Sequence, residues 1–232
     1  MAKNKSLNIA WQSQERVPGL ISGEDALMIY NSLSKQARVG LKYDKNTRTM
    51  IGSTPIAVAN LDSMAQQYGA RTPNLRDLSR PEIMKIAKGQ YYIDSRNLVV
   101  RSLKDSNCPQ NNFLLQTIYE LAEQKEGRIK YPFIIEGFSF VPNQEDELGY
   151  GLSIVAGKDF KVVQDERFDG KYNGKSFSEV DSQGIPNFDK NGSRTWYAKS
   201  TGLSWLYLSR DLNLYSYYSN LALSNDGVGW FS

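Results

Sequence analysis

The stretch that decides the predicted fold is Leu206-Tyr-Leu-Ser-Arg-Asp-Leu-Asn-Leu214. Every even position in it is Leu except Arg210. The odd positions are Tyr207, Ser209, Asp211 and Asn213. Because successive side chains of an extended chain point to opposite faces, the leucines are expected to face a core and the odd positions to face solvent.

A polar aromatic loop, Tyr215-Ser-Tyr-Tyr-Ser-Asn220, follows, and Leu221 and Leu223 then resume the apolar rhythm. Tyrosine provides rigid amphipathic contact area and small polar residues provide adaptable hydrogen bonds, a combination typical of antibody paratopes. We therefore interpret the segment from Tyr207 to Asp226 as a binding surface. The alternative interpretation is an amphipathic edge hairpin with an ordinary polar face.

The composition of the last thirty residues is biased. Lys, Glu, Gln and Met supply 44 of the 232 residues, yet none of them occurs between Leu203 and Ser232. Burial alone could remove Lys and Glu from this segment. Randomising the adenines of adenine-adenine-pyrimidine codons has the same effect, because it yields Tyr, Ser, Asp, Asn, Leu or Ala but never Lys, Glu, Gln, Met or Trp.

Together with this bias, three features resemble the variable region of a diversity-generating retroelement protein, and the whole chain is similar to the archaeal branch of that family. They are Gly202-Leu-Ser-Trp205, the spaced leucine frame, and Ser224-Asn-Asp-Gly-Val-Gly229. The resemblance implies a C-type-lectin fold whose C-terminal codons are rewritten by adenine-specific mutagenesis through a reverse transcriptase. It implies that the variable, ligand-contacting positions are Tyr207, Ser209, Asp211, Asn213, Tyr215, Ser216, Tyr217, Tyr218, Ser219, Asn220, Asn225 and Asp226. It also implies a fixed scaffold of Trp205, Leu206, Leu208, Arg210, Leu212 and Leu214.

The chain departs from relatives of this fold in three respects. Animal C-type lectins are held by disulfides, which Cys108 alone cannot form, and their calcium-and-sugar triplets are absent. Bacterial and phage variable regions are often Asn-rich and Arg-spaced, whereas this one is Leu-spaced.

Upstream of the segment, hydrophobic periodicity and capping signals predict helices at about 22–36, 61–68, 79–88 and 111–126. Strands are expected in a hairpin at 40–51, in 91–100 with a turn near 94–97, and at 132–140 and 150–163. Residues 165–193 are expected to be a loop. The fold class is therefore α+β, with mixed antiparallel strands, two or more helices, long loops and no disulfides. We expect an N-terminal helix and hairpin region, 1–89, to pack on a main domain, 90–232, with its variable region at about 203–232.

Composition argues against several classes of function. The 28 basic and 25 acidic residues leave a net charge of +3 without a basic stripe, so nucleic acid is not an expected partner. The absence of histidine removes Ser–His and Cys–His nucleophiles and the common zinc ligand sets. Asn187–Gly192 resembles the opening of a calcium loop, but Ala198 stands where a bidentate Glu is required. No cofactor or metal is expected.

The N-terminal residues show no secretory signal, and no apolar run is long enough to span a bilayer. The product is therefore expected to be soluble. The sequence leaves its location open, including display or export by a route without a visible signal. The first hypothesis is a non-enzymatic binding protein that displays diversified side chains to a protein or cell-surface target. A monomer is favoured over an oligomer. The alternative is a structural or virion-type interaction protein that pairs subunits through its C-terminal segment. A histidine-free carbohydrate-active enzyme with Trp196, Trp205 and Tyr207 as a sugar platform ranks third.

Overall fold

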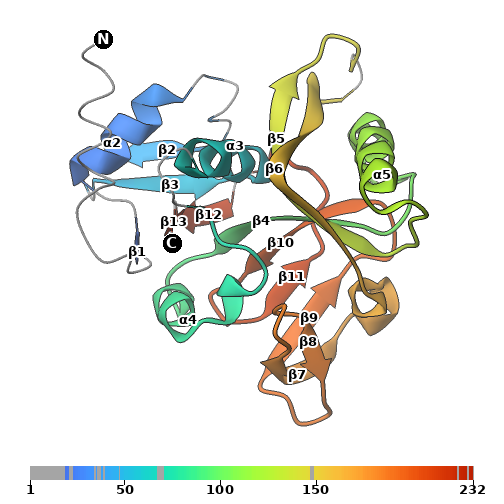
Figure 1. Ribbon diagram of the computed structural model, residues 1–232. Helices are drawn as coiled ribbons and strands as arrows, with labels where there is room; N and C mark the ends of the chain where they lie inside the picture. Colours follow the sequence, from blue (N-terminus) through green and yellow to red (C-terminus); the bar gives the residue numbers. More distant parts are fainter. Residues whose placement is uncertain are drawn as a thin grey trace.

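An eight-stranded sheet occupies the centre of the computed structural model (Figure 1). The model describes residues 19–20, 23–33, 35, 38, 40–46, 48–66, 71–146, 149–223, 225–228 and 230–231. The strand order is β6-β5-β4-β10-β11-β9-β7-β8, and all neighbours are antiparallel except β11 and β9. The strands are β4 (Ile93–Val100), β5 (Phe133–Pro142), β6 (Leu152–Gln164), β7 (Lys175–Val180), β8 (Pro186–Phe188), β9 (Arg194–Ala198), β10 (Leu203–Leu208) and β11 (Leu214–Ser216).

Two smaller sheets join the ends of the chain. One has the order β12-β3-β2, and the other pairs β1 with β13. Their strands are β1 (Gly19–Leu20), β2 (Lys42–Asp44), β3 (Thr49–Ser53), β12 (Asn225–Val228) and β13 (Trp230–Phe231). The C-terminal strands therefore pair with N-terminal strands of the same chain, across the boundary expected at residue 89.

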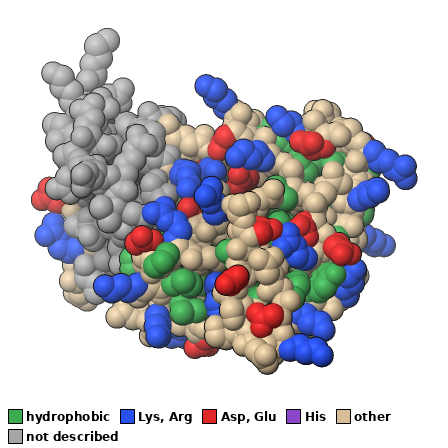
Figure 2. Space-filling view, turned by 60° about the horizontal axis from the view of Figure 1, so that its bottom comes forward, with side chains coloured by type: hydrophobic (Ala, Val, Ile, Leu, Met, Phe, Trp, Pro, Cys, Tyr) green, Lys and Arg blue, Asp and Glu red, His purple; other side chains and the backbone are tan. Residues whose placement is uncertain are grey.

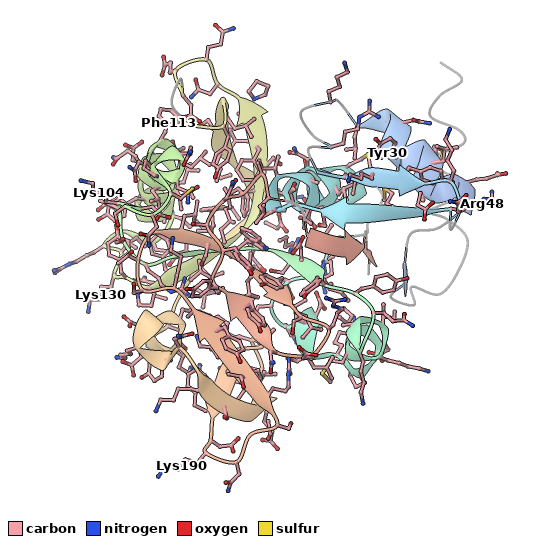
Figure 3. The ribbon with its side chains drawn as sticks, turned by 180° about the vertical axis from the view of Figure 1, so that it is seen from behind. Tyr30, Arg48, Lys104, Phe113, Lys130 and Lys190 are labelled. Atoms are coloured by element: carbon pink, nitrogen blue, oxygen red, sulfur yellow. The ribbon has the colours of Figure 1, made fainter. Side chains whose placement is uncertain are left out.

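Four α-helices lie in the described part of the chain: α2 (Gly23–Ser32), α3 (Pro55–Gln66), α4 (Pro81–Ala87) and α5 (Asn112–Glu126). Short 3-10 turns are η1 (Asp77–Ser79), η2 (Pro109–Asn111), η3 (Glu166–Phe168) and η4 (Gly170–Tyr172). The predicted α+β class, with mostly antiparallel strands and one free cysteine, is confirmed. Figure 3 shows the arrangement from behind, with Tyr30 of α2 and Lys190 of the β8–β9 turn far apart.

Strand β10 lies between β4 and β11, and hydrophobic clusters cover both of its faces. Leu206 and Leu208 belong to the cluster that contains Trp196 of β9. Trp205 and Tyr207 belong to the opposite cluster, which is built on α5 and β5. An inner strand buried on both faces does not separate a core side from a solvent side, so the alternation of this segment does not predict exposure.

The predicted turn near 94–97 is wrong, because β4 runs without a break from Ile93 to Val100 and all of its residues are buried. Ser95, Arg96 and Asn97 of this strand have hydrogen-bond partners inside the protein. Ser95 Oγ donates to Leu206 O at 2.7 Å, and Arg96 Nη1 contacts Asp62 Oδ2 of α3 at 2.9 Å. Buried polar groups are tolerated where such partners exist, and these contacts come from residues distant in sequence.

Two further expectations needed correction. The helix expected at 61–68 begins at Pro55, where Thr54 Oγ1 accepts a hydrogen bond from Ala57 N at 3.1 Å and Pro55 takes the first helical position. The loop expected at 165–193 contains β7, β8 and two 3-10 turns. The helix expected at 111–126 is confirmed, with Asn111 at its N-cap position, although that side chain makes no capping bond.

Candidate binding surface

A row of tyrosine rings crosses three strands on one face of the large sheet. Tyr197 of β9 is in register with Tyr215 of β11, which is in register with Tyr207 of β10. The Tyr197 and Tyr215 ring centroids are 4.4 Å apart, and those of Tyr215 and Tyr207 are 5.1 Å apart, with interplanar angles of 19° and 13°. Cross-strand aromatic pairs stabilise a sheet and fix the direction of its side chains.

The chain then folds back over this row. Residues 217–223, which we call the display loop, follow β11. Tyr218 stacks on Tyr207 and Trp205, with centroid separations of 6.1 Å and 5.8 Å, and Tyr217 meets Tyr218 edge-on at 5.9 Å. Tyr217 is 53% exposed, Tyr218 43% and Leu223 44%, so the loop carries large apolar groups at the surface. Exposed apolar groups that gather in one place mark interaction sites.

Two side chains from outside the display loop hold its backbone. Asn111, fully buried at the start of α5, donates from Nδ2 to Ser219 O at 3.0 Å. The Tyr150 hydroxyl, which precedes β6, accepts from Leu221 N at 3.0 Å and donates to Asn111 Oδ1 at 3.1 Å. Burial raises the pKa of Tyr150 well above its ordinary value, so the hydroxyl keeps the proton that it donates. Asn111 and Tyr150, which do not belong to the loop, thus hold its backbone in addition to the packing of its own Tyr218 and Leu221.

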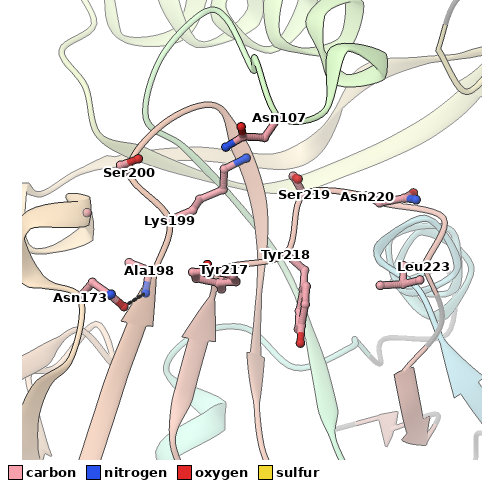
Figure 4. A pocket seen from close by; sticks show the side chains of 11 residues that line it. Asn107, Asn173, Ala198, Lys199, Ser200, Tyr217, Tyr218, Ser219, Asn220 and Leu223 are labelled. Atoms are coloured by element: carbon pink, nitrogen blue, oxygen red, sulfur yellow. Dashed lines mark hydrogen bonds between the residues drawn. The ribbon is translucent and has the colours of Figure 1, made fainter.

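A groove of about 540 Å³ separates the display loop from the end of β9. Figure 4 shows Tyr217 and Tyr218 on one side, Lys199 and Ser200 on the other, and Asn107 above them. The lining residues are Asn107, Gly170, Asn173, Ala198, Lys199, Ser200, Tyr217, Tyr218, Ser219, Asn220 and Leu223. They offer aromatic rings, amides and hydroxyls, which provide contact area and hydrogen bonds but no carboxylate, thiol or imidazole for proton transfer.

Lys199, the one charged residue of the lining, is neutralised by the buried Asp105 carboxylate. Lys199 Nζ lies 2.7 Å from Asp105 Oδ2, and the two side chains are 7% and 0% exposed. Asp105 also accepts hydrogen bonds from Cys108 N, Leu203 N and Asn111 Nδ2. This buried pair connects the floor of the groove to the residue that holds the display loop.

Three of the expected ligand-contacting residues, Tyr207, Ser209 and Ser216, are buried, and the expectation that Tyr207 and Ser209 face solvent is wrong. Tyr207 is 2% exposed, because the rings of Tyr92, Trp205, Tyr215 and Tyr218 pack around it. Ser209 Oγ accepts from Asn213 N within the turn after β10, and Ser216 Oγ accepts from Arg101 Nη2 inside the core. These serines use their hydroxyls for internal bonds.

The remaining expected residues separate into groups. Tyr217, Tyr218, Ser219 and Asn220 line the groove together, whereas Asp211 is exposed in the distant β10–β11 turn. Half-buried Asn213 accepts from Thr195 N at 2.7 Å, and half-buried Tyr215 lies in the tyrosine row. Asn225 and Asp226 lie in β12, of which only the backbone is described.

The expected scaffold residues are mostly buried. Trp205, Leu206, Leu208 and Leu214 are each fully buried. Leu212 is half-buried in the β10–β11 turn, with a φ of 64°, and Arg210 is exposed with its guanidinium 4.9 Å from the centre of the Tyr92 ring.

Sequence reasoning missed most of the groove wall opposite the tyrosines, namely Asn107, Asn173, Lys199 and Ser200, and the anchors Asn111 and Tyr150. In the sequence, position 111 marks only the start of a predicted helix. Nothing in the local sequence signals that a helix cap would instead reach a carbonyl more than a hundred positions away.

No family model, curated protein or solved structure matches the chain. Within the described residues no helix has the length and apolar character needed to cross a bilayer, and no group of three or more acidic, cysteine or histidine residues is placed to hold a metal ion. On the face shown in Figure 2, basic and acidic side chains are interspersed and do not gather into a patch of one sign.

Proposed function

We propose that this chain is a ligand-binding protein of the C-type-lectin-like, retroelement-diversified kind, which presents variable side chains on a fixed scaffold to a protein or cell-surface target. The display loop and its groove form the contact surface, with Tyr217 and Tyr218 as anchors. Aromatic anchors surrounded by small polar groups are a common source of binding energy at protein interfaces.

The observation that carries this proposal is that the side chains exposed by the display loop differ from the groups that hold its backbone. Asn111 and Tyr150 bond to its backbone, whereas the Tyr217 side chain points into the groove or to solvent. A surface that must accept many sequences needs a conformation that does not depend on its own side chains. The display loop meets this requirement at Tyr217, whereas Tyr218 stacks on Tyr207, Leu221 is buried and Asn220 Oδ1 accepts a hydrogen bond from Ala222 N.

The genomic neighbourhood of the gene provides the decisive test. We expect a near-copy of the codons for 203–232 that carries adenine at the positions where the two copies differ, beside a reverse transcriptase gene. Differences should concentrate in the codons for Asp211 and the display loop. A neighbourhood with neither a copy nor a reverse transcriptase would contradict diversification and leave the groove as a fixed interface.

Stability measurements test the separation directly. Tyr217→Ala combined with Asn220→Ala should change the free energy of unfolding by less than about 1 kcal/mol, because both side chains are exposed and the bond from Ala222 N to Asn220 Oδ1 is open to solvent. Tyr150→Phe should cost about 1–3 kcal/mol, since it leaves Leu221 N and Asn111 Oδ1 without their partner. Urea unfolding followed by circular dichroism measures both. The reverse order of effects would mean that the loop side chains, and not the anchors, maintain its conformation.

Subunit pairing through the C-terminal segment is the alternative function. It needs a C-terminal strand that is available to a neighbouring molecule. In the structure β12 pairs with β3 and β13 pairs with β1 in the same chain, so these strands already have partners on one edge. We therefore place the alternative second.

A further inference from the structure

Arg194, at the start of β9, is a buried cation without a counter-charge. Its side chain is 7% exposed, and among the described residues no carboxylate oxygen lies within 4.0 Å of its guanidinium. Nε donates to Leu212 O at 2.6 Å and Nη1 donates to Ser79 Oγ at 3.2 Å, while buried Nη2 has no hydrogen-bond partner in the described structure. Burial lowers the pKa of Arg194 to about 10, which reflects the cost of holding the charge there.

Arg101 provides an internal comparison. It is equally buried, and its guanidinium also contacts only neutral groups. Each of its three nitrogens nevertheless has an acceptor: Phe168 O, Ser204 Oγ and Ser216 Oγ. Arg101 is therefore a completed part of the core, whereas the hydrogen bonding of Arg194 is incomplete.

Arg194, whose guanidinium carbon lies 4.7 Å from the centre of the Phe177 ring, is one of the residues that line an open cleft of about 550 Å³ between α4, β7 and the β10–β11 turn. Two serine hydroxyls share this lining. Ser79 Oγ accepts from Arg194 Nη1, and Ser178 Oγ accepts from Ser193 N at 3.3 Å. Because each oxygen is already an acceptor, each hydroxyl proton can be donated to a ligand in the cleft.

We propose that this cleft binds a carboxylate, with Arg194 supplying the positive charge and Ser79 and Ser178 supplying hydroxyl donors. The ligand would provide the acceptor that Nη2 lacks, and its charge would offset the cost of burying the guanidinium. The site is distinct from the groove of the display loop and does not depend on whether the C-terminal residues vary.

The rim of the cleft restricts the ligand further. Glu179 and Asp211 also line it, and both side chains are exposed. Two nearby negative charges repel a dianion such as phosphate more strongly than a singly charged carboxylate. Because Nη2 is covered, binding requires a small outward movement of the guanidinium, so simple carboxylates should bind with dissociation constants on the order of millimolar.

Titration followed by amide and arginine side-chain NMR tests this proposal at constant ionic strength. Acetate should produce saturable shifts at Leu212, Ser178 and the Arg194 Nε–H, whereas chloride should not. N-acetylglycine, which mimics the carboxylate end of a polypeptide, is the second probe. Binding tighter than that of acetate would identify the end of a polypeptide as the ligand, and otherwise the ligand is a free small carboxylate. Shifts that do not saturate, or that chloride reproduces, would overturn the site, and tighter binding of phosphate would overturn its carboxylate selectivity.

Two variants at exposed positions keep the test independent of folding. Ser178→Ala should weaken acetate binding about tenfold, because a hydrogen bond to a charged group is lost. Asp211→Asn should tighten it by about threefold, because one repelling charge is removed. Glu126→Gln, at the end of α5, is the matched control and should leave the affinity unchanged. If Ser178→Ala and Asp211→Asn behave like this control, the assignment of the cleft is wrong.

Discussion

Replacing Tyr207 with alanine is expected to lower the free energy of unfolding by about 3–5 kcal/mol, the range found when a buried aromatic side chain is truncated. Its ring is 2% exposed and is stacked between those of Tyr215 and Tyr218. Truncation would leave a cavity at the β10 end of the tyrosine row and remove a contact on which Tyr218 rests. Urea unfolding monitored by tryptophan fluorescence measures the loss.

Tyr217→Ala is the matched control, because Tyr217 lies beside the same row and is 53% exposed. Its removal should leave the free energy of unfolding within about 0.5 kcal/mol of the parent. A cost for Tyr207→Ala as small as that of the control would mean that the display loop does not cover β10 in solution.

The expected result has a consequence for the proposed diversification. A small polar residue in place of Tyr207 would lose the stacking with Tyr215 and open a void below Tyr218. Position 207 is therefore predicted to tolerate little variation, whereas the exposed positions of the display loop tolerate much more. The positions that the resemblance implies to be variable thus fall into two groups: buried residues that stabilise the fold and exposed residues that can contact a ligand.

The elements that the sequence predicted well are those determined by local pattern. The helix at Asn112–Glu126 has its apolar residues on one face and ends at Gly127, whose φ of 75° suits glycine. The α+β class followed from the order of such elements. The β2–β3 hairpin was likewise signalled by turn residues between two short runs.

What the sequence could not reveal depends on contacts between distant residues. The parallel pairing of Tyr215 with Tyr197, the pairing of β12 with β3, and the bond from Asn111 to Ser219 O have no local signal. The alternation in β10 was misread for the same reason, since only the tertiary structure shows that both faces of the strand are covered. Gly202 is a further example: its φ is 73°, and a side chain there would collide with Asp105.

The second large effect is expected for Asp105→Asn, which should lower the free energy of unfolding by about 3–5 kcal/mol, the cost of breaking a buried ion pair. The Asp105 carboxylate is inaccessible to solvent, and Lys199 Nζ lies 2.7 Å from it. The amide would leave the ammonium buried without a counter-charge and would place an N–H group among the donors that now converge on the carboxylate. Urea unfolding again provides the measurement.

A double variant separates the ion pair from the packing around it. Adding Lys199→Met to Asp105→Asn removes the uncompensated charge, so part of the lost stability should return. Glu166→Gln breaks the solvent-exposed pair with Lys171, whose atoms are 3.1 Å apart, and should leave stability nearly unchanged. If Asp105→Asn costs no more than this control, the Lys199–Asp105 pair is hydrated in solution. The groove would then have a charged, solvated floor in place of the buried and neutralised pair.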